Sequence, residues 1–131
     1  RRYEQVLRGM RALPRHVSVL ATSSLYQHFL TGADGALTGF ANFAPQFCVD
    51  LYESVQGADL ERARKLHDIN YALEAAIYKA PNVYKHSRYK VAAYLAGLLD
   101  NLVVRRPQVP VPEGEVELIR RAMEKLGFVK R

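Results

Sequence analysis

The histidines and the single cysteine are the side chains in this sequence that could hold a metal ion. His16, His28, His67 and His86 are scattered along the chain without the short spacings of metal ligands. His28 could face the rim of a site, but we expect it on a solvated helix face. Cys48 stands alone in an apolar run, so it has no partner for an internal disulfide. We therefore expect no metal site and no cofactor, and the lone cysteine favours a reducing compartment.

Basic and aromatic side chains could together bind nucleic acid. The chain has 19 Lys and Arg against 13 Asp and Glu, a formal net charge of +6 that attracts polyanions and anionic membranes. The cations are dispersed, however, and the group Lys85, Arg88 and Lys90 suits a solvated face or ion pairs with a neighbouring subunit. Tyrosines recur at helical spacing between Tyr71 and Tyr94, which favours packing in a core or a subunit interface over base stacking.

The composition is that of a soluble globular chain. Its 131 residues are 49% hydrophobic and 24% charged, which is enough to bury a core and too apolar for a disordered segment. No apolar stretch reaches the roughly 18–20 residues of a membrane span, and no signal peptide opens the chain. We expect a cytoplasmic protein without a membrane partner, and a cut or processed start would explain why Arg1 stands where an initiator Met is usual.

The apolar spacing predicts alternating helices and strands before Pro45. A helix covers residues 2–13, a strand 16–21, a short helix stops at Gly32, and a second strand covers 35–40. About a dozen residues containing the short helix separate the two strands, which is the length that a right-handed parallel crossover needs. The pattern is typical of an α/β fold.

From Pro45 onward the spacing is helical. The expected helix boundaries are Pro45 at a first helical position, Asp59 and Ser87 as N-caps, Glu113 for the last helix, and Gly127 at its end. A proline-stiffened linker at 105–112 precedes the last helix. Because parallel strands need further strands beside them, the two strands either pair with strands outside this sequence or form a vestigial ribbon on a helical bundle.

Several motifs follow one another along the chain. They are Leu30–Pro45 with its Gly-Ala-Asp-Gly turn and its Ala-Asn element, then Cys48–Tyr52, Gly57–His67, Lys90–Leu98 and Arg106–Pro110. Their order and spacing resemble the dihydrodipicolinate synthase/N-acetylneuraminate lyase family. In that family a Gly-Ala-Asp-Gly turn leads into the last barrel strand, and a Gly-Asp-Leu turn opens a later helix.

The resemblance implies the C-terminal part of a (β/α)₈ TIM barrel, followed by a helical C-terminal extension. Residues 16–21 would be barrel strand seven and residues 35–40 strand eight, so that 1–56 hold the last barrel units and 57–131 the extension. Members of the family act on pyruvate or related 2-oxo acids through a lysine Schiff base. That lysine closes strand six and a relay tyrosine lies earlier still, so both would lie upstream of Arg1.

The resemblance also implies substrate contacts at the ends of the two strands. The matching positions are Ala21, Thr22, Ser23 and Ser24 after the first strand, and Thr38, Gly39 and Phe40 at the end of the second. Hydroxyl side chains replace the family's Gly-Asp-type element after the first strand, which suggests a smaller or differently charged distal group on the substrate. Other roles stay open, because Ser23 and Ser24 can cap a helix and Thr38 with Gly39 can form a bulge or a tight strand exit.

The implied function is that of a lysine Schiff-base aldolase or lyase acting on a 2-oxo acid and an aldehyde. The lysines, from Lys65 to Lys130, fall in the helical region or its turns, so none fits the Schiff-base role and this piece should be inactive alone. The intact protein would be a homo-oligomer, a tetramer in the family. The alternative is a non-catalytic basic helical module that binds nucleic acid or protein, which the two buried-type strands argue against.

Overall fold

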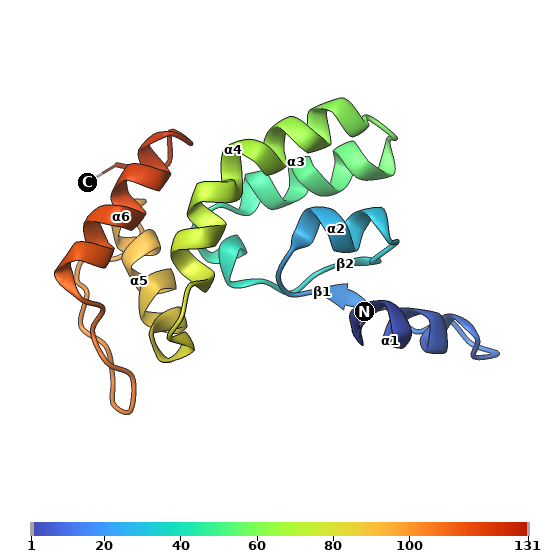
Figure 1. Ribbon diagram of the computed structural model, residues 1–131, viewed down its shortest axis with the longest axis horizontal. Helices are drawn as coiled ribbons and strands as arrows, with labels where there is room; N and C mark the ends of the chain where they lie inside the picture. The colour runs from blue at the N-terminus through green and yellow to red at the C-terminus, as the bar shows by residue number, and fades with distance from the viewer. Residues whose placement is uncertain (1, 131) are drawn as a thin grey trace. The chain divides into compact units, whose positions relative to one another are not determined.

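The computed structural model describes residues 2–130 as helices joined by loops, with one small sheet (Figure 1). The elements are α1 (Arg2–Arg11), β1 (Leu20–Ala21), α2 (Leu25–Leu30), β2 (Gly35–Ala36), the 3₁₀ helix η1 (Gly39–Asn42), α3 (Pro45–Gln56), α4 (Leu60–Tyr78), the 3₁₀ helix η2 (Asn82–Tyr84), α5 (Lys85–Leu95) and α6 (Glu113–Glu124). They form two compact units. The first runs to Ala41 and includes Pro45–Leu66, and the second holds Asn42–Ala44 and the chain from His67 onward.

The sheet of the first unit is a parallel pair, as the crossover length predicts. Leu20 lies opposite Gly35 and Ala21 opposite Ala36. The strands are much shorter than the predicted 16–21 and 35–40. The chain leaves β2 for η1 at Gly39, and Asp34 acts at the start of β1. Its carboxylate accepts the Val19 N–H at 2.8 Å, so a side chain takes the bond that would have extended the ladder toward the start of β1.

Helix boundaries in the first unit follow local backbone chemistry. Gly32 has a φ of 96° and closes α2, with its N–H donated to the Phe29 carbonyl at 2.9 Å. Pro45 begins α3, and the Asp59 carboxylate caps α4 by accepting the Arg62 N–H at 3.0 Å. These three predictions are confirmed, whereas α1 ends at Arg11 rather than at residue 13.

The core of the first unit lies between the sheet, α2 and α3. The two helices α2 and α3 pack side by side (Figure 1). Its fully buried members include Leu7 of α1, Ala21 of β1, Leu25 and Phe29 of α2, and Leu51 of α3. The Phe29 ring meets the Tyr52 ring edge to face, with centroids 5.2 Å apart. This apolar contact fixes α2, and with it the loop that joins β1 to α2.

In the second unit α5 packs against α6. The helix α6 ends at Glu124, three residues before the predicted Gly127, which has a φ of 70° and donates its N–H to the Glu124 carbonyl at 3.0 Å. The prediction that Ser87 caps α5 is wrong. The helix begins at Lys85, directly after η2, so Ser87 lies inside its first turn and donates its hydroxyl to the Val109 carbonyl at 2.6 Å. Ser87 therefore holds the proline-rich linker against α5.

The expectation of a solvated basic face on α5 is also wrong for Arg88, whose side chain is fully buried. Its guanidinium donates to the Glu115 carboxylate at 2.8 Å and to the backbone carbonyls of Ile77 at 3.3 Å and Lys79 at 2.5 Å. The ammonium of Lys79 adds an ion pair with Glu115 at 3.2 Å. Arg88 is thus an internal cation that joins the end of α4 to α6.

The tyrosines of the second unit divide between packing and exposure. The Tyr89 hydroxyl donates to the Tyr78 hydroxyl at 2.9 Å, and the two rings meet edge to face. Packing, as the sequence predicts, is thus the role of these two residues, whereas Tyr71 is 65% exposed. In the described part of the chain, none of the helices combines the length and the apolar character needed to cross a membrane.

Candidate functional site

The parallel pairing of β1 and β2 brings the two predicted site segments to one edge of the sheet. Both strands run in the same direction, so the residues that follow Ala21 and those that follow Ala36 leave from neighbouring carboxyl ends. The Ala21 carbonyl accepts the Leu37 N–H at 2.8 Å and continues the pairing into these segments. Loops at the carboxyl ends of parallel strands are where α/β folds place their ligand sites.

The segment after β1 begins with the fully buried Ala21 and then reaches solvent at Thr22 and Ser24, with Ser23 half-buried. Ser24 has left-handed backbone angles, φ 49° and ψ 48°, and its side chain makes no capping bond to α2. A non-glycine residue in this region carries a strain of about 1 kcal/mol or more. The hydroxyl of Ser24 is therefore held at the rim by the backbone rather than used to cap a helix.

The segment after β2 turns at once into η1. The Thr38 hydroxyl accepts the Phe40 N–H at 3.3 Å, and the Thr38 carbonyl accepts the Ala41 N–H at 3.3 Å. Thr38 and Gly39 thus form a tight strand exit, and both stay partly exposed. Phe40 is 1% exposed, so a ligand at this edge would meet the side chains of Thr22, Ser24 and Thr38 before those of Ala21 and Phe40.

Two further aromatic residues, Tyr3 and His28, are not indicated by the sequence motifs that predict the site. The rings of Tyr3 in α1 and His28 in α2 stack, with centroids 3.7 Å apart and planes at 22°. The Tyr3 hydroxyl and His28 Nδ1 are both buried, and among residues 2–130 the hydroxyl has no hydrogen-bond partner. Burial lowers the pKa of His28 and raises the pKa of Tyr3. The expectation that His28 is solvated is wrong, and its spacing signals this, because it lies three residues after Leu25 and next to Phe29, both of them buried.

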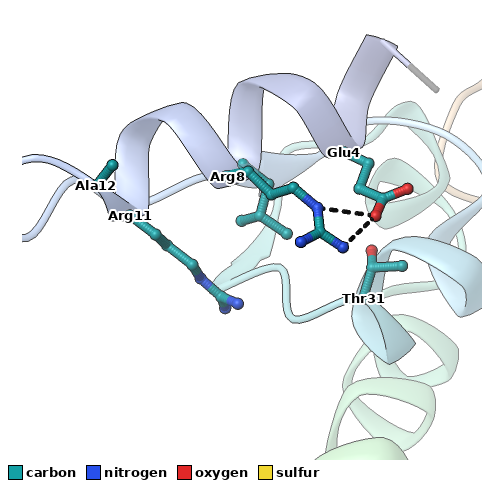
Figure 2. A pocket seen from close by; sticks show the side chains of 6 residues that line it. Glu4, Arg8, Arg11, Ala12 and Thr31 are labelled. Atoms are coloured by element: carbon teal, nitrogen blue, oxygen red, sulfur yellow. Dashed lines mark hydrogen bonds and ion pairs between the residues drawn. The ribbon is translucent and has the colours of Figure 1, made fainter.

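A cavity of about 540 Å³ opens along α1 and is lined by Glu4, Leu7, Arg8, Arg11, Ala12 and Thr31 (Figure 2). Two of its cations already have partners, since Arg8 pairs with Glu4 at 2.6 Å and Arg11 donates to the Gly32 carbonyl at 2.7 Å. Ala12 and Thr31 follow α1 and α2 and lead toward the amino ends of the strands. The cavity therefore belongs to the opposite end of the sheet from the predicted site residues.

Metal ligands do not cluster in the part of the chain that the structure describes, and several lysines have partners of their own. In residues 2–130 no three His, Cys, Asp or Glu side chains come together as a metal site would require, and Cys48 is buried. Three of the lysines have partners elsewhere: Lys65 pairs with Glu61, Lys79 with Glu115, and Lys90 donates to a backbone carbonyl. At the carboxyl edge of the sheet the chain contributes the side-chain hydroxyls of Thr22, Ser24 and Thr38, backbone groups and Gly39.

The protein resembles known proteins in both sequence and fold. The model of the dihydrodipicolinate synthetase family matches residues 20–126. A 4-hydroxy-tetrahydrodipicolinate synthase from Methanopyrus kandleri is 34% identical over 98 residues, which cover 75% of this chain and 31% of the relative. The chain thus spans about a third of the length of the curated relatives that it matches.

Solved structures add the fold. A dihydrodipicolinate synthase from Bacteroides thetaiotaomicron matches with a TM-score of 0.76 and 26% identity, covering 93% of this chain and 42% of that one. A prophage protein of the dihydrodipicolinic acid synthase family from E. coli K12, solved in complex with pyruvate, matches with a TM-score of 0.80 and 23% identity, covering 96% of this chain and 42% of that one. The fold is that of part of a TIM-barrel protein. The chain belongs to the dihydrodipicolinate synthetase family.

Proposed function

We propose that this chain is the C-terminal part of a lysine Schiff-base aldolase or lyase that acts on pyruvate or another 2-oxo acid together with an aldehyde. In this proposal β1 is barrel strand seven and β2 strand eight. Residues 1–56 complete the barrel, and residues 57–131 form a helical extension. The family membership and the 42% coverage of its structural neighbours support a partial barrel of this kind.

The observation that carries the proposal is the parallel alignment of β1 and β2, which collects both polar segments at one edge. Ala21, Thr22, Ser23 and Ser24 would contact the distal part of the substrate, and Thr38, Gly39 and Phe40 would face the substrate from the end of β2. Hydroxyl groups donate and accept, so they suit the hydroxyl, carbonyl or carboxylate oxygens of a 2-oxo acid or its aldehyde partner.

The covalent step would use a lysine that this chain does not place at the strand ends. In such an enzyme the lysine amine attacks the 2-oxo carbon and water leaves, and the resulting iminium accepts electrons from the carbanion at the neighbouring carbon. A nucleophilic lysine in a barrel must also point into the mouth formed by the carboxyl ends of the strands. The lysines here follow β2 in sequence by many residues, in or beside α4, α5 and α6.

Borohydride trapping tests the proposal. Borohydride reduces an imine to a stable secondary amine, so the chain is incubated with pyruvate and borohydride and then weighed by mass spectrometry. We expect no adduct on the 131-residue chain. A chain extended upstream through the preceding strands should gain one pyruvate-derived adduct. A stable adduct on any lysine between Lys65 and Lys130 would refute the assignment of the catalytic lysine to another strand.

Assembly is a separate part of the proposal. The intact protein is expected to form a homo-oligomer, and its partners are small-molecule substrates rather than nucleic acid. Sedimentation equilibrium on the extended chain measures this directly. A protein that stays monomeric at all concentrations would contradict the expected oligomer and would leave the proposed reaction untested by this experiment.

A further inference from the structure

The second unit contains a hollow of about 410 Å³ that the proposed reaction does not use. One side of it is a single face of α5, where His86, Tyr89, Lys90 and Ala93 follow one another at helical spacing. Leu98 and Leu99, just beyond α5, form a second wall, and Asn42 contributes from the end of η1. None of these residues belongs to the segments 21–24 and 38–40 of the strand-end site.

The polar groups of this hollow are cationic or neutral. Lys90 is half-buried and donates to the Val103 carbonyl, which holds the ammonium in place and leaves further N–H groups for a ligand. The His86 ring meets the Tyr89 ring edge to face, with centroids 6.2 Å apart. Among residues 2–130, none that lines the hollow carries a carboxylate, so an anion would meet no like charge from these walls.

The rest of the lining is apolar. Ala93 is buried, and Leu98 and Leu99 keep 57% and 37% of their surface exposed. The Tyr89 hydroxyl is already engaged by Tyr78, so this side chain offers mainly its ring. A ligand that covered the leucines would remove apolar surface from water, which is favourable at roughly 25 cal/mol per Å².

We propose that this hollow binds a small monocarboxylate with an apolar body. Its carboxylate would accept hydrogen bonds from the Lys90 ammonium, with the Asn42 carboxamide and the His86 ring as neighbouring polar groups. Its hydrocarbon part would cover Ala93, Leu98 and Leu99. The volume lies within the range of about 300–1,000 Å³ that is usual for small-molecule sites.

Titration calorimetry with 4-methylpentanoate tests the ligand class on this chain as it stands. Two related probes separate the contributions of the carboxylate and of the hydrocarbon part. 4-Methylpentanamide keeps the hydrocarbon chain and lacks the charge, whereas acetate keeps the charge and lacks the chain. We expect each of them to bind at least about tenfold more weakly than 4-methylpentanoate. Equal binding of the acid and its amide would overturn the proposal, and so would the absence of any heat from the acid at millimolar concentrations.

Variants locate the site. Lys90→Met keeps the length of the side chain and removes the ammonium, and we expect it to weaken binding of the acid by at least about tenfold. Lys85→Met is the matched control, because Lys85 lies on the same helix outside the hollow and should leave binding unchanged. Equal affinities for the two variants would contradict the assignment of the carboxylate to Lys90.

A second variant guards against a folding effect of Lys90→Met, since Lys90 also holds Val103. Leu98→Glu places a carboxylate on an exposed wall, where it should not disturb packing, and is expected to abolish binding of the acid at an unchanged Tm. Methyl NMR of the parent chain should show perturbations at Ala93, Leu98 and Leu99. Perturbations at residues 21–24 instead would assign the acid to the strand-end site and overturn the proposal.

Discussion

At the scale of single residues, Arg88 has the most consequential environment. A fully buried guanidinium is costly unless its donors are satisfied, and here the Glu115 carboxylate and two backbone carbonyls accept from it. An exposed pair such as Arg121 with Glu117, at the same distance of 2.8 Å, contributes little because water screens it. The two pairs therefore predict very different responses to mutation.

Arg88→Met should lower the free energy of unfolding by about 3 kcal/mol or more, because it removes the main partner of the half-buried Glu115 carboxylate. It also leaves the backbone carbonyls of Ile77 and Lys79 without this donor. Arg121→Met is the control and should change stability by less than about 0.5 kcal/mol. Urea denaturation of both variants measures the difference. Comparable losses for the two would mean that the Arg88 pair behaves as a surface pair.

The pH dependence of stability follows from the same cluster. The hydrogen bond from Arg88 holds the pKa of Glu115 below its ordinary value of 4.5, against an opposing effect of burial. A carboxyl whose pKa is lowered on folding stabilises the protein above the unfolded pKa and loses that contribution as pH falls through the folded value. Stability should thus fall with acid below about pH 4.5.

Glu115→Gln removes this titration and keeps the shape of the side chain. We expect the variant to be less stable than the parent near pH 7 and the gap to narrow as pH falls below about 4. Urea denaturation across this pH range gives the comparison. A gap that stayed constant with pH would show that Glu115 does not titrate differently in the folded and unfolded states.

At the scale of elements, glycines and side-chain caps decide where helices end, whereas neighbours decide how far strands extend. Gly32 ends α2 because it adopts a φ of 96°, which side chains disfavour. The close approach of Arg11 reinforces this, since a Cβ on Gly32 would lie 2.5 Å from its guanidinium. In β1 the carboxylate of Asp34 takes the Val19 N–H, and the ladder starts only at Leu20.

Gly32→Ala should therefore destabilise the first unit by about 1–2 kcal/mol, from the left-handed backbone and the displacement of Arg11. Gly9→Ala is the control, and it should change stability in the opposite direction. Gly9 lies in α1, where an added Cβ would meet nothing within 4 Å, so alanine should stabilise by about 0.5–1 kcal/mol. Thermal unfolding followed by circular dichroism measures both variants. A Gly32→Ala variant as stable as the parent would argue against backbone strain at this position.

At the scale of the whole molecule, the positive charge is spread over local ion pairs rather than gathered for a polyanion. Arg8 pairs with Glu4, Lys65 with Glu61 and Arg121 with Glu117, each within one or two turns of a single helix. Such pairs present alternating charges to solvent. The net charge of +6 is consequently a weak guide to the partner of this protein.

Fluorescence anisotropy with a labelled DNA duplex at low salt checks this conclusion. We expect no binding that falls steeply with salt, which is the signature of counterion release from phosphates. Tight binding at low salt that is lost as salt increases would favour the alternative function, a basic helical module for nucleic acid.

Some features of the molecule could be predicted from the sequence because they depend on neighbouring residues along the chain. Pro45, Asp59 and Gly32 mark helix ends through their own backbone or capping chemistry, and the crossover between the strands follows from its length. The common edge of segments 21–24 and 38–40 also follows from the sequence, because parallel strands bring their carboxyl ends together. Ordered motifs along the chain likewise indicate the family.

Only the tertiary structure decided the environments of several polar side chains, because the groups that they contact lie far away in the sequence. Arg88 is buried only because Glu115 and the end of α4 converge on it, and Ser87 binds the linker only because Val109 passes over it. His28 is stacked rather than solvated since α1 places Tyr3 over its ring. Local spacing sets where an element begins and ends, whereas the burial and pairing of a polar side chain depend on which distant element packs beside it.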